Sequence, residues 1–320
     1  KSVAEGIKKV FDDPTSAEHV AARARVLVEE RYSWDLLAPQ YGEVFQTVKP
    51  RKEMKKILFL APIYPPDIGG PATHALHLVR GFRAAGFRVR VFARFRTRLL
   101  SIFRILFASR YADILYTNDV TASGIHAWLS RKPYIVRVGG DLLWERAGVN
   151  ISMREFYARG LHRKSLRFVI GKRVLSRAAR VIVPATNLVS LYENVYGIPP
   201  EKIILVPNPI PEGNQFHEEV RLRGLQESDF RGKIILFAGR DVPYKNVSVI
   251  TRAVEKIPNA RFVHVKDTAH TDVKRYIALA SVCVSAATTE FSPNFILECI
   301  GAGKPVLVSR EHGLSFPLPE

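Results

Sequence analysis

The sequence predicts an α/β protein with two parallel β-sheets, each in a domain of its own. From residue 55 onward, short apolar runs alternate with helix-like segments, which is the pattern of repeated βαβ units. The runs are apolar on both faces, as expected for strands buried within a parallel sheet. The proline-rich segment 206–211 separates six such runs from four. We therefore expect two Rossmann-like domains, residues 54–208 and 209–320, facing each other across a cleft.

The apolar runs give the expected strands in order. The first series predicts strands at Ile57–Pro62, Val89–Ala93, Ile114–Thr117, Tyr134–Val138, Val181–Val183 and Ile203–Val206. The second series predicts strands at Ile234–Phe237, Arg261–Val265, Val282–Ser285 and Val306–Ser309. Because open parallel sheets bind ligands at the carboxyl ends of their strands, the loops after these runs are where a site is expected.

Residues 1–50 do not share this alternation. They contain three helical stretches and no predicted strand: Val3–Phe11, Ala17–Glu30 and Trp34–Val48. Met54 precedes the first strand as an initiator would, and the sequence stops soon after the last strand. Two interpretations stay open: an unrelated helical extension, or helices displaced from another place in the fold.

Composition narrows the class of protein. The chain has 320 residues, 47% of them hydrophobic and 24% charged, which excludes disordered and collagen-like proteins. Cys283 and Cys299 are the only cysteines, so a disulfide framework and a cysteine metal cluster are excluded. No apolar run reaches the roughly 20 residues of a membrane span, and we expect no signal peptide.

The charge is strongly basic and unevenly placed. Lys and Arg number 48 against 30 Asp and Glu, for a net charge of +18. No acidic residue lies between Asp67 and Asp113, where the basic residues are Arg80, Arg83, Arg88, Arg90, Arg94, Arg96, Arg98, Arg104 and Arg110. A second basic stretch covers residues 154–180.

Within the first basic stretch, residues 97–107 form an apolar helix with Arg on one side. This pattern is typical of helices that bind an anionic membrane surface. The alternative is a helix whose apolar side faces the core and whose basic side is solvated. Nucleic acid is not expected as a partner, because no recognised nucleic-acid-binding motif accompanies the charge.

Three motifs follow predicted strands. The first is Gly69-Gly70, before a helix starting near Pro71, where the backbone can approach a ligand and free amides can bind an anion. The second is Gly239-Arg240-Asp-Val-Pro-Tyr-Lys245, which places two cations where a diphosphate could bind. A plain turn and two solvated cations are the alternatives for these two motifs.

The third motif is Glu290-Phe-Ser-Pro-Asn-Phe-Ile-Leu-Glu298. A helix is predicted to start near Pro293, so one carboxylate lies before it and the other about one turn inside it. Such a pair could bind two sets of sugar hydroxyls, with free helix amides between them for phosphate. Carboxylates are also common at helix starts because the helix dipole favours them there.

Together, the three motifs resemble those of the family 4 retaining nucleotide-sugar glycosyltransferases, which have the GT-B fold. They occur in the family's order across residues 54–320. The resemblance implies that Arg240 and Lys245 hold the donor diphosphate, that Glu290 contacts the transferred sugar, and that Glu298 contacts the ribose. It places Gly69 and Gly70 beside the phosphates and the acceptor. The donor-binding set it implies is completed by Gly239, Phe291, Ser292 and Asn294.

The sequence departs from the family pattern in several places. Phe291 and Asn246 occupy positions where the family often has Gly, and the linker carries Asn208-Pro209 instead of Asn-Gly. After the fourth strand the family often has a His, which is missing here, and Asp141 is the candidate to take over its catalytic role. The catalytic set implied is therefore Glu290, Arg240, Lys245 and Asp141.

The resemblance implies transfer of a sugar from a UDP- or GDP-linked donor to an acceptor hydroxyl, with retention of configuration and without a metal or separate cofactor. The acceptor is expected to be lipid-linked or a membrane-associated glycan, and the protein peripheral on the cytoplasmic face of the cell membrane. Two alternatives stay open: a GT-B nucleotide-sugar epimerase or hydrolase, and a noncatalytic protein that binds nucleotide-sugar or nucleic acid.

The resemblance also suggests an origin for the first helices. Family members close with helices like those of residues 1–50, the last of which crosses back to the first domain. We therefore expect a circular permutant, whose original start was Met54 and whose original end lay near Lys49.

Overall fold

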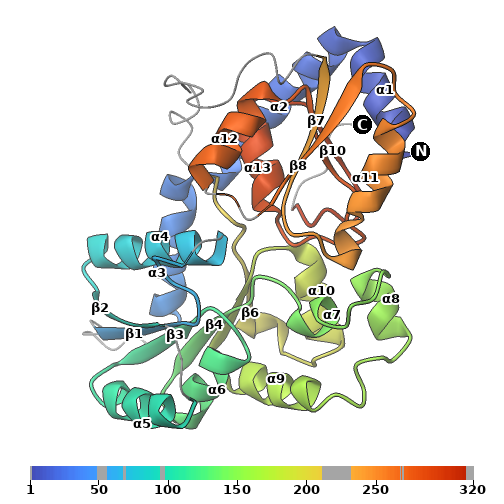
Figure 1. Ribbon diagram of the computed structural model, residues 1–320. Helices are drawn as coiled ribbons and strands as arrows, with labels where there is room; N and C mark the ends of the chain where they lie inside the picture. The colour runs from blue at the N-terminus through green and yellow to red at the C-terminus, as the bar shows by residue number, and fades with distance from the viewer. Residues whose placement is uncertain are drawn as a thin grey trace. The chain divides into compact units, whose positions relative to one another are not determined.

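The computed structural model describes residues 2–48, 56–67, 70–93, 98–210, 232–266, 268 and 270–314. The chain packs as two compact units (Figure 1). Unit 1 combines Lys1–Leu36, Ala147–Glu155 and Asn208–Glu320, and unit 2 combines Leu37–Arg146 with Phe156–Pro207. Each unit contains one parallel sheet, and each is described by itself.

The sheet of unit 2 has six parallel strands in the order β2-β1-β3-β4-β5-β6. Its strands are β1 (Lys56–Ala61), β2 (Arg88–Ala93), β3 (Ile114–Thr117), β4 (Tyr134–Arg137), β5 (Arg180–Val183) and β6 (Ile203–Leu205). The central strands β3 and β4 are buried along their whole length, as their continuous apolar runs predict. The six expected strands are thus confirmed, with ends that differ by at most one residue.

Helices connect these strands and cover both faces of the sheet (Figure 1). They are α3 (Trp34–Gln46), α4 (Gly70–Ala84), α5 (Arg98–Ser109), α6 (Ala122–Leu129), α7 (Leu142–Glu145), α8 (Met153–Ala158), α9 (Leu166–Arg177), α10 (Thr186–Asn194) and the 3-10 turn η1 (Pro200–Lys202). No helix in the described part of the chain is long and apolar enough to cross a membrane.

An aromatic cluster attaches α3 to unit 2. The ring of Phe45 on α3 packs edge-on against Phe82 of α4, with centroids 4.9 Å apart, and stacks on Tyr116 of β3 at 6.0 Å. Tyr116 in turn stacks on Phe59 of β1 at 5.0 Å. These buried rings explain why the chain joins unit 2 at Leu37.

The sheet of unit 1 has four parallel strands in the order β10-β9-β7-β8. Its strands are β7 (Lys233–Ala238), β8 (Ala260–Val265), β9 (Val282–Ser285) and β10 (Val306–Val308), which confirms the second series. Its helices are α1 (Val3–Asp12), α2 (Pro14–Tyr32), α11 (Val247–Val254), α12 (His270–Leu279), α13 (Asn294–Gly301) and the 3-10 turn η4 (Pro243–Lys245).

Two hydrophobic clusters line the two faces of this sheet. On one face, Ile7 of α1 and Ile250 of α11 pack against Ile235 and Val284. On the other face, Ile277 of α12 packs against Leu236. Helix α2 lies against α13, where Val28 contacts the cluster of Ile296 and Ile300.

A capping box fixes the start of helix α1, and a close contact with β10 fixes its position in unit 1. Ser2 and Glu5 form a reciprocal capping box, with Glu5 N donating to Ser2 Oγ at 3.2 Å and Ser2 N to Glu5 Oε2 at 2.8 Å. Gly6 faces β10 so closely that a Cβ there would stand 2.7 Å from a methyl carbon of Leu307. The first two helices therefore belong to the core of unit 1, although a circular permutation as their origin stays a prediction.

Unit 1 also takes up a short segment from the middle of the chain. Met153 N donates a hydrogen bond to Thr289 Oγ1 at 3.1 Å, and Thr288 Oγ1 donates to Ile151 O at 3.5 Å. These bonds explain why Ala147–Glu155 packs with unit 1, whereas a boundary at residue 208 would leave it with the first domain.

Candidate active site

Three loops of unit 1 carry the residues of the second and third motifs. One follows β7 and leads into η4, one follows β9 and leads into α13, and one follows β10 at Glu311–Leu314. Because β7, β9 and β10 run parallel, these loops leave the same edge of the sheet. The sequence therefore folds so that two motifs 45 residues apart can meet.

The central contact at this edge is an ion pair between Lys245 and Glu290. Lys245 Nζ lies 2.5 Å from Glu290 Oε1, and their side chains are 18% and 10% exposed. Ser285 Oγ donates to the same oxygen at 3.3 Å. Removing a charge pair from water costs free energy unless further hydrogen bonds accompany it. The hydroxyl of Ser285 supplies such a bond.

The backbone around η4 fixes the lysine. Lys245 N donates to Val242 O at 2.9 Å, and Asn246 ends the turn in the left-handed region with φ +53°. The Asn246 side chain then donates to Ala286 O at 3.0 Å, which connects η4 to the loop after β9. Asn tolerates this conformation better than most residues, so it can stand where the family often has Gly.

A second set of contacts fixes the glutamate. Glu290 N donates to Glu311 O at 2.8 Å, and Thr289 Oγ1 donates to Glu311 Oε2 at 2.8 Å. Gly313, with φ +67°, passes so close that a Cβ would stand 2.1 Å from Glu290 O. The loop after β10 therefore holds Glu290 by a fit that only glycine allows.

A pocket of about 170 Å³ opens beside the ion pair. Its lining includes Lys245 and Glu290, the end of β7 at Phe237 and Ala238, and the first turn of α13. The first backbone N–H groups of a helix have no partner within the helix and attract anions. The pocket thus combines a cation, a carboxylate and a helix N-terminus.

Ser292 and Asn294 bind Asn208, which lies in the linker between β6 and β7. Asn208 Nδ2 donates to Ser292 O and to Asn294 Oδ1, both at 2.9 Å, and Asn208 N donates to Ser292 Oγ at 3.2 Å. Ser292 itself has φ +56°. Asn294 also lines the pocket, whereas Ser292 does not.

The other predicted donor residues, Gly239, Arg240 and Glu298, do not line this pocket. Gly239 follows β7 and its carbonyl accepts a hydrogen bond from His264 Nε2 at 2.9 Å, and the next residue, Arg240, has an exposed side chain. Glu298 is buried on the inner side of α13. Burial lowers the pKa of Lys274 on α12, and the nearby charge of Glu298 acts in the opposite direction. The structure therefore brings Lys245 and Glu290 together.

Phe291 is buried directly after Glu290, which accounts for an aromatic residue where the family often has Gly. In unit 2, α4 begins at Gly70, one residue before the predicted Pro71. Gly69 lies outside the described residues.

Sequence reasoning missed a buried polar cluster in unit 2. His74 of α4, Tyr41 of α3 and Arg137 at the end of β4 are each at least nine-tenths buried. The Tyr41 hydroxyl lies 3.4 Å from His74 Nε2 and accepts a hydrogen bond from Arg137 Nε at 3.3 Å. Burial, together with the charge of Arg137, holds the pKa of His74 well below its ordinary value of 6.5. An Arg at the carboxyl end of an otherwise apolar strand was the signal available in the sequence.

Asp141, which is predicted to be catalytic, caps α7. Its Oδ1 accepts from Trp144 N at 2.7 Å, and its Oδ2 accepts from the hydroxyls of Tyr157 and Tyr196 at 2.9 and 3.1 Å. Asp141 is 2% exposed, and burial raises the pKa of its carboxyl. With both oxygens bound inside unit 2, the geometry favours a structural role.

Comparison with known proteins gives these contacts a context. Residues 93–209 match the model of the glycosyl transferase 4-like domain. No curated protein sequence matches the chain. Among solved structures, sucrose-phosphate synthase from Thermosynechococcus elongatus superposes with a TM-score of 0.63 at 16% identity, covering 82% of this chain and 83% of that chain.

Two further structures superpose over similar lengths. WaaG, a glycosyltransferase involved in lipopolysaccharide biosynthesis, gives a TM-score of 0.56 at 15% identity and covers 81% of this chain and 82% of its own. HepE from Anabaena, solved with UDP and glucose, gives 0.54 at 14% identity, with the same coverage. At these identities the likeness establishes the fold, and the expected α/β GT-B class is confirmed.

Proposed function

The chain has the GT-B fold and contains a glycosyl transferase 4-like domain, and we propose that it is a retaining glycosyltransferase that uses a nucleotide diphosphate-sugar. The observation that carries this proposal is the Lys245–Glu290 pair beside the pocket at the start of α13. The pair provides one group for the diphosphate and one for the sugar within a single contact.

Lys245 can bind the sugar donor while it stays paired with Glu290. An ammonium group has three N–H donors, and the Glu290 oxygen uses one of them. The other two can bind diphosphate oxygens, together with the free amides of α13 and the guanidinium of Arg240. As the bond to the sugar breaks, negative charge develops on the diphosphate, and these groups stabilise it.

Glu290 would then bind hydroxyls of the transferred sugar. Its position is fixed from behind by Glu311 and Gly313, so the sugar is held at a constant distance from the diphosphate. We propose that the acceptor hydroxyl attacks from the face that the diphosphate leaves and passes its proton to the departing phosphate oxygen, which retains the configuration. Transfer is proposed to need no metal, and addition of a chelator tests this.

The donor is proposed to be UDP- or GDP-linked, since HepE, of the same fold, was solved with UDP and glucose. The acceptor is proposed to be lipid-linked or a membrane-associated glycan at the cytoplasmic face of the cell membrane. WaaG acts in lipopolysaccharide biosynthesis, and unit 2 exposes several large apolar side chains next to arginines.

A donor screen tests the proposal. UDP-, GDP- and ADP-sugars are added to the protein, and thermal shift, release of nucleoside diphosphate and formation of glycosylated product are measured. Glu290→Gln and Lys245→Ala are expected to lower product formation by about a hundredfold or more. Glu255→Gln and Lys256→Ala, which change exposed residues of the same unit, are the matched controls and should leave it unchanged.

The competing functions predict other results. An epimerase or hydrolase would convert the donor without glycosylating any acceptor, and a noncatalytic binding protein would shift in melting temperature without turnover. If no donor releases a nucleoside diphosphate and Glu290→Gln leaves donor binding unchanged, the transferase proposal fails.

A further inference from the structure

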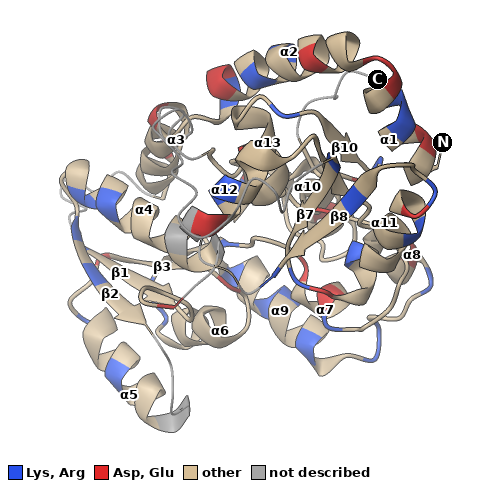
Figure 2. Cartoon of the chain, turned by 45° about the horizontal axis from the view of Figure 1, so that its top comes forward, with Lys and Arg blue, Asp and Glu red and all other residues tan. Residues whose placement is uncertain are grey.

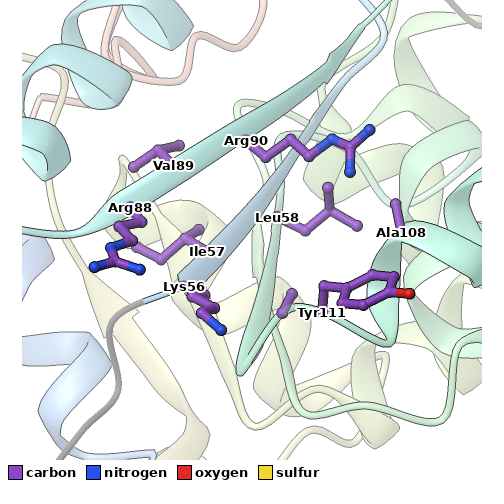
Figure 3. A pocket seen from close by; sticks show the side chains of 9 residues that line it. Lys56, Ile57, Leu58, Arg88, Val89, Arg90, Ala108 and Tyr111 are labelled. Atoms are coloured by element: carbon purple, nitrogen blue, oxygen red, sulfur yellow. The ribbon is translucent and has the colours of Figure 1, made fainter.

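A second pocket lies in unit 2, at the opposite edge of the sheet from the carboxyl ends of its strands (Figure 3). It has a volume of about 320 Å³. Lys56 and Arg88 are the first residues of β1 and β2 and pair directly across the two strands, and Leu58 pairs with Arg90. Residues two apart on a strand share a face, so Lys56, Arg88 and Arg90 gather on one face of the sheet.

The pocket has an apolar floor and a cationic rim. Leu58, Ala108 and Ala112 line it and are buried, whereas the three cations are exposed. In the described part of the chain, no ion pair neutralises these cations. The nearby carboxylate of Asp113 is bound to the backbone N of Lys56 at 3.0 Å. Like charges side by side on neighbouring strands destabilise a sheet, so an anion would relieve the repulsion.

Helix α5 borders this pocket and turns an apolar face to solvent. Leu100 is 66% exposed, Phe103 70% and Phe107 58%, and the spacing of three and four residues puts them on one side of the helix. The opposite side, with Ile105 and Ala108, is buried in unit 2. Helix α5 therefore buries one apolar side in unit 2 and exposes a second apolar side, in addition to its arginines.

Tyr111 joins the two features. It is 63% exposed, its ring packs edge-on against Phe107 at 5.7 Å, and it also lines the pocket. The pocket and the exposed face of α5 therefore form one continuous surface, which we call the α5 surface. No Asp or Glu occurs between Asp67 and Asp113, and the described part of α5 carries no acidic side chain (Figure 2).

We propose that the α5 surface binds an anionic phospholipid of the membrane. The lipid phosphate would lie among Lys56, Arg88 and Arg90, while Leu100, Phe103 and Phe107 enter the boundary between headgroups and acyl chains. This inference rests on the proposed function in that it supplies the surface by which unit 2 would reach a membrane-bound acceptor.

A membrane fits this surface better than a protein or a nucleic acid does. A nucleic acid would use the cations but leave three large apolar side chains in water. A lipid bilayer offers an anionic surface directly above an apolar layer, the same order as the cationic rim and the apolar helix face. Each cation near an anionic membrane adds about fivefold to binding, so the three together add roughly a hundredfold.

Vesicle co-sedimentation tests the proposal. The full chain is mixed with phosphatidylcholine vesicles with and without phosphatidylglycerol, and the bound fraction is measured. Lys56→Gln/Arg88→Gln/Arg90→Gln is expected to lower binding to the anionic vesicles by roughly a hundredfold. The matched control Arg167→Gln/Lys172→Gln/Arg173→Gln removes the same charge from exposed positions of α9 and should lower binding by less than tenfold.

The apolar part is tested separately with Phe103→Ser/Phe107→Ser. Binding should fall by at least tenfold, because two exposed rings no longer enter the bilayer. A second variant, Phe103→Trp, should shift its fluorescence to shorter wavelength on addition of anionic vesicles. Equal losses in the two charge variants, or no loss in the serine variant, would overturn the proposal.

Two competitors identify the ligand. Inorganic phosphate at millimolar concentration should not release the protein from vesicles, and duplex DNA or RNA should bind more weakly than the vesicles do. Full release by phosphate, or tighter binding of nucleic acid, would overturn a lipid site. Thermal shift with the donor separates the two proposals, because the α5-surface variants should bind donor normally even where vesicle binding is lost.

Discussion

The role of Asp141 can be decided by comparing two substitutions. Its carboxylate accepts three hydrogen bonds inside unit 2, from Trp144 N, Tyr157 and Tyr196. Asp141→Ala removes the helix cap, which costs about 1 kcal/mol. The hydroxyls of Tyr157 and Tyr196 lie 3.2 Å apart, so one can still donate to the other and only one loses its partner. A buried hydroxyl without a partner costs about 1–3 kcal/mol more.

The expected loss for Asp141→Ala is therefore about 2–4 kcal/mol, which lowers the melting temperature of a unit of this size by roughly 4–16 °C. Asp141→Asn should cost less than about 1 kcal/mol. The amide keeps an oxygen for Trp144 N, and its NH₂ group can donate to hydroxyls that rotate to accept.

Tryptophan fluorescence follows this transition, since Trp144 is 1% exposed and its backbone N–H donates to Asp141. Release of nucleoside diphosphate is measured on the same samples. If Asp141 has only a structural role, the Asp141→Asn variant should stay both stable and active. If Asp141→Asn keeps its melting temperature but loses activity by a hundredfold, Asp141 is catalytic and the reasoning from its hydrogen bonds is refuted.

Three further results are expected. Gly313→Ala should destabilise unit 1 by at least about 1–2 kcal/mol in thermal unfolding and weaken donor binding, because its Cβ would collide with Glu290 O; an unchanged donor shift would contradict this. Because the pKa of His74 is lowered in the folded protein, the unfolded chain binds a proton at a pH where the folded protein does not. The free energy of unfolding therefore falls as the pH drops below about 6.5. His74→Gln should flatten that slope by up to about 1.4 kcal/mol per pH unit, measured by melting temperature, and an unaltered slope would exclude His74 as the source. Cys283 and Cys299 are fully buried, and burial raises the pKa of the Cys299 thiol, so a thiol reagent should react only after unfolding; fast reaction in the native state would contradict the packing.

The strands were predictable because a parallel sheet leaves a simple trace in sequence. A strand buried on both faces, such as β3, has to be apolar at every position, and a run of that kind is visible without a structure. The division between the two units was less visible. It depends on Phe45 and on the bonds of Met153, which are made between segments far apart in the chain.

The candidate site was predictable in part for a similar reason. Motif spacing placed Lys245 and Glu290 on loops at one sheet edge, and the structure brings them together. Spacing says nothing about which partners a side chain finds when it is buried. The bond between Asp141 and Tyr157 and the contact of His74 with Tyr41 depend on tertiary packing, so local sequence could not reveal them.

The composition of unit 1 from three chain segments has a consequence for synthesis on the ribosome. Helix α1 leaves the ribosome long before β7, although Ile7 is completely buried against Ile235 in the folded unit. At a translation rate of roughly 5–20 residues per second, the intervening chain takes about 10–45 seconds to make. During this interval the apolar side of α1 has no sheet to cover it, so it stays exposed to aggregation until β7 has been made.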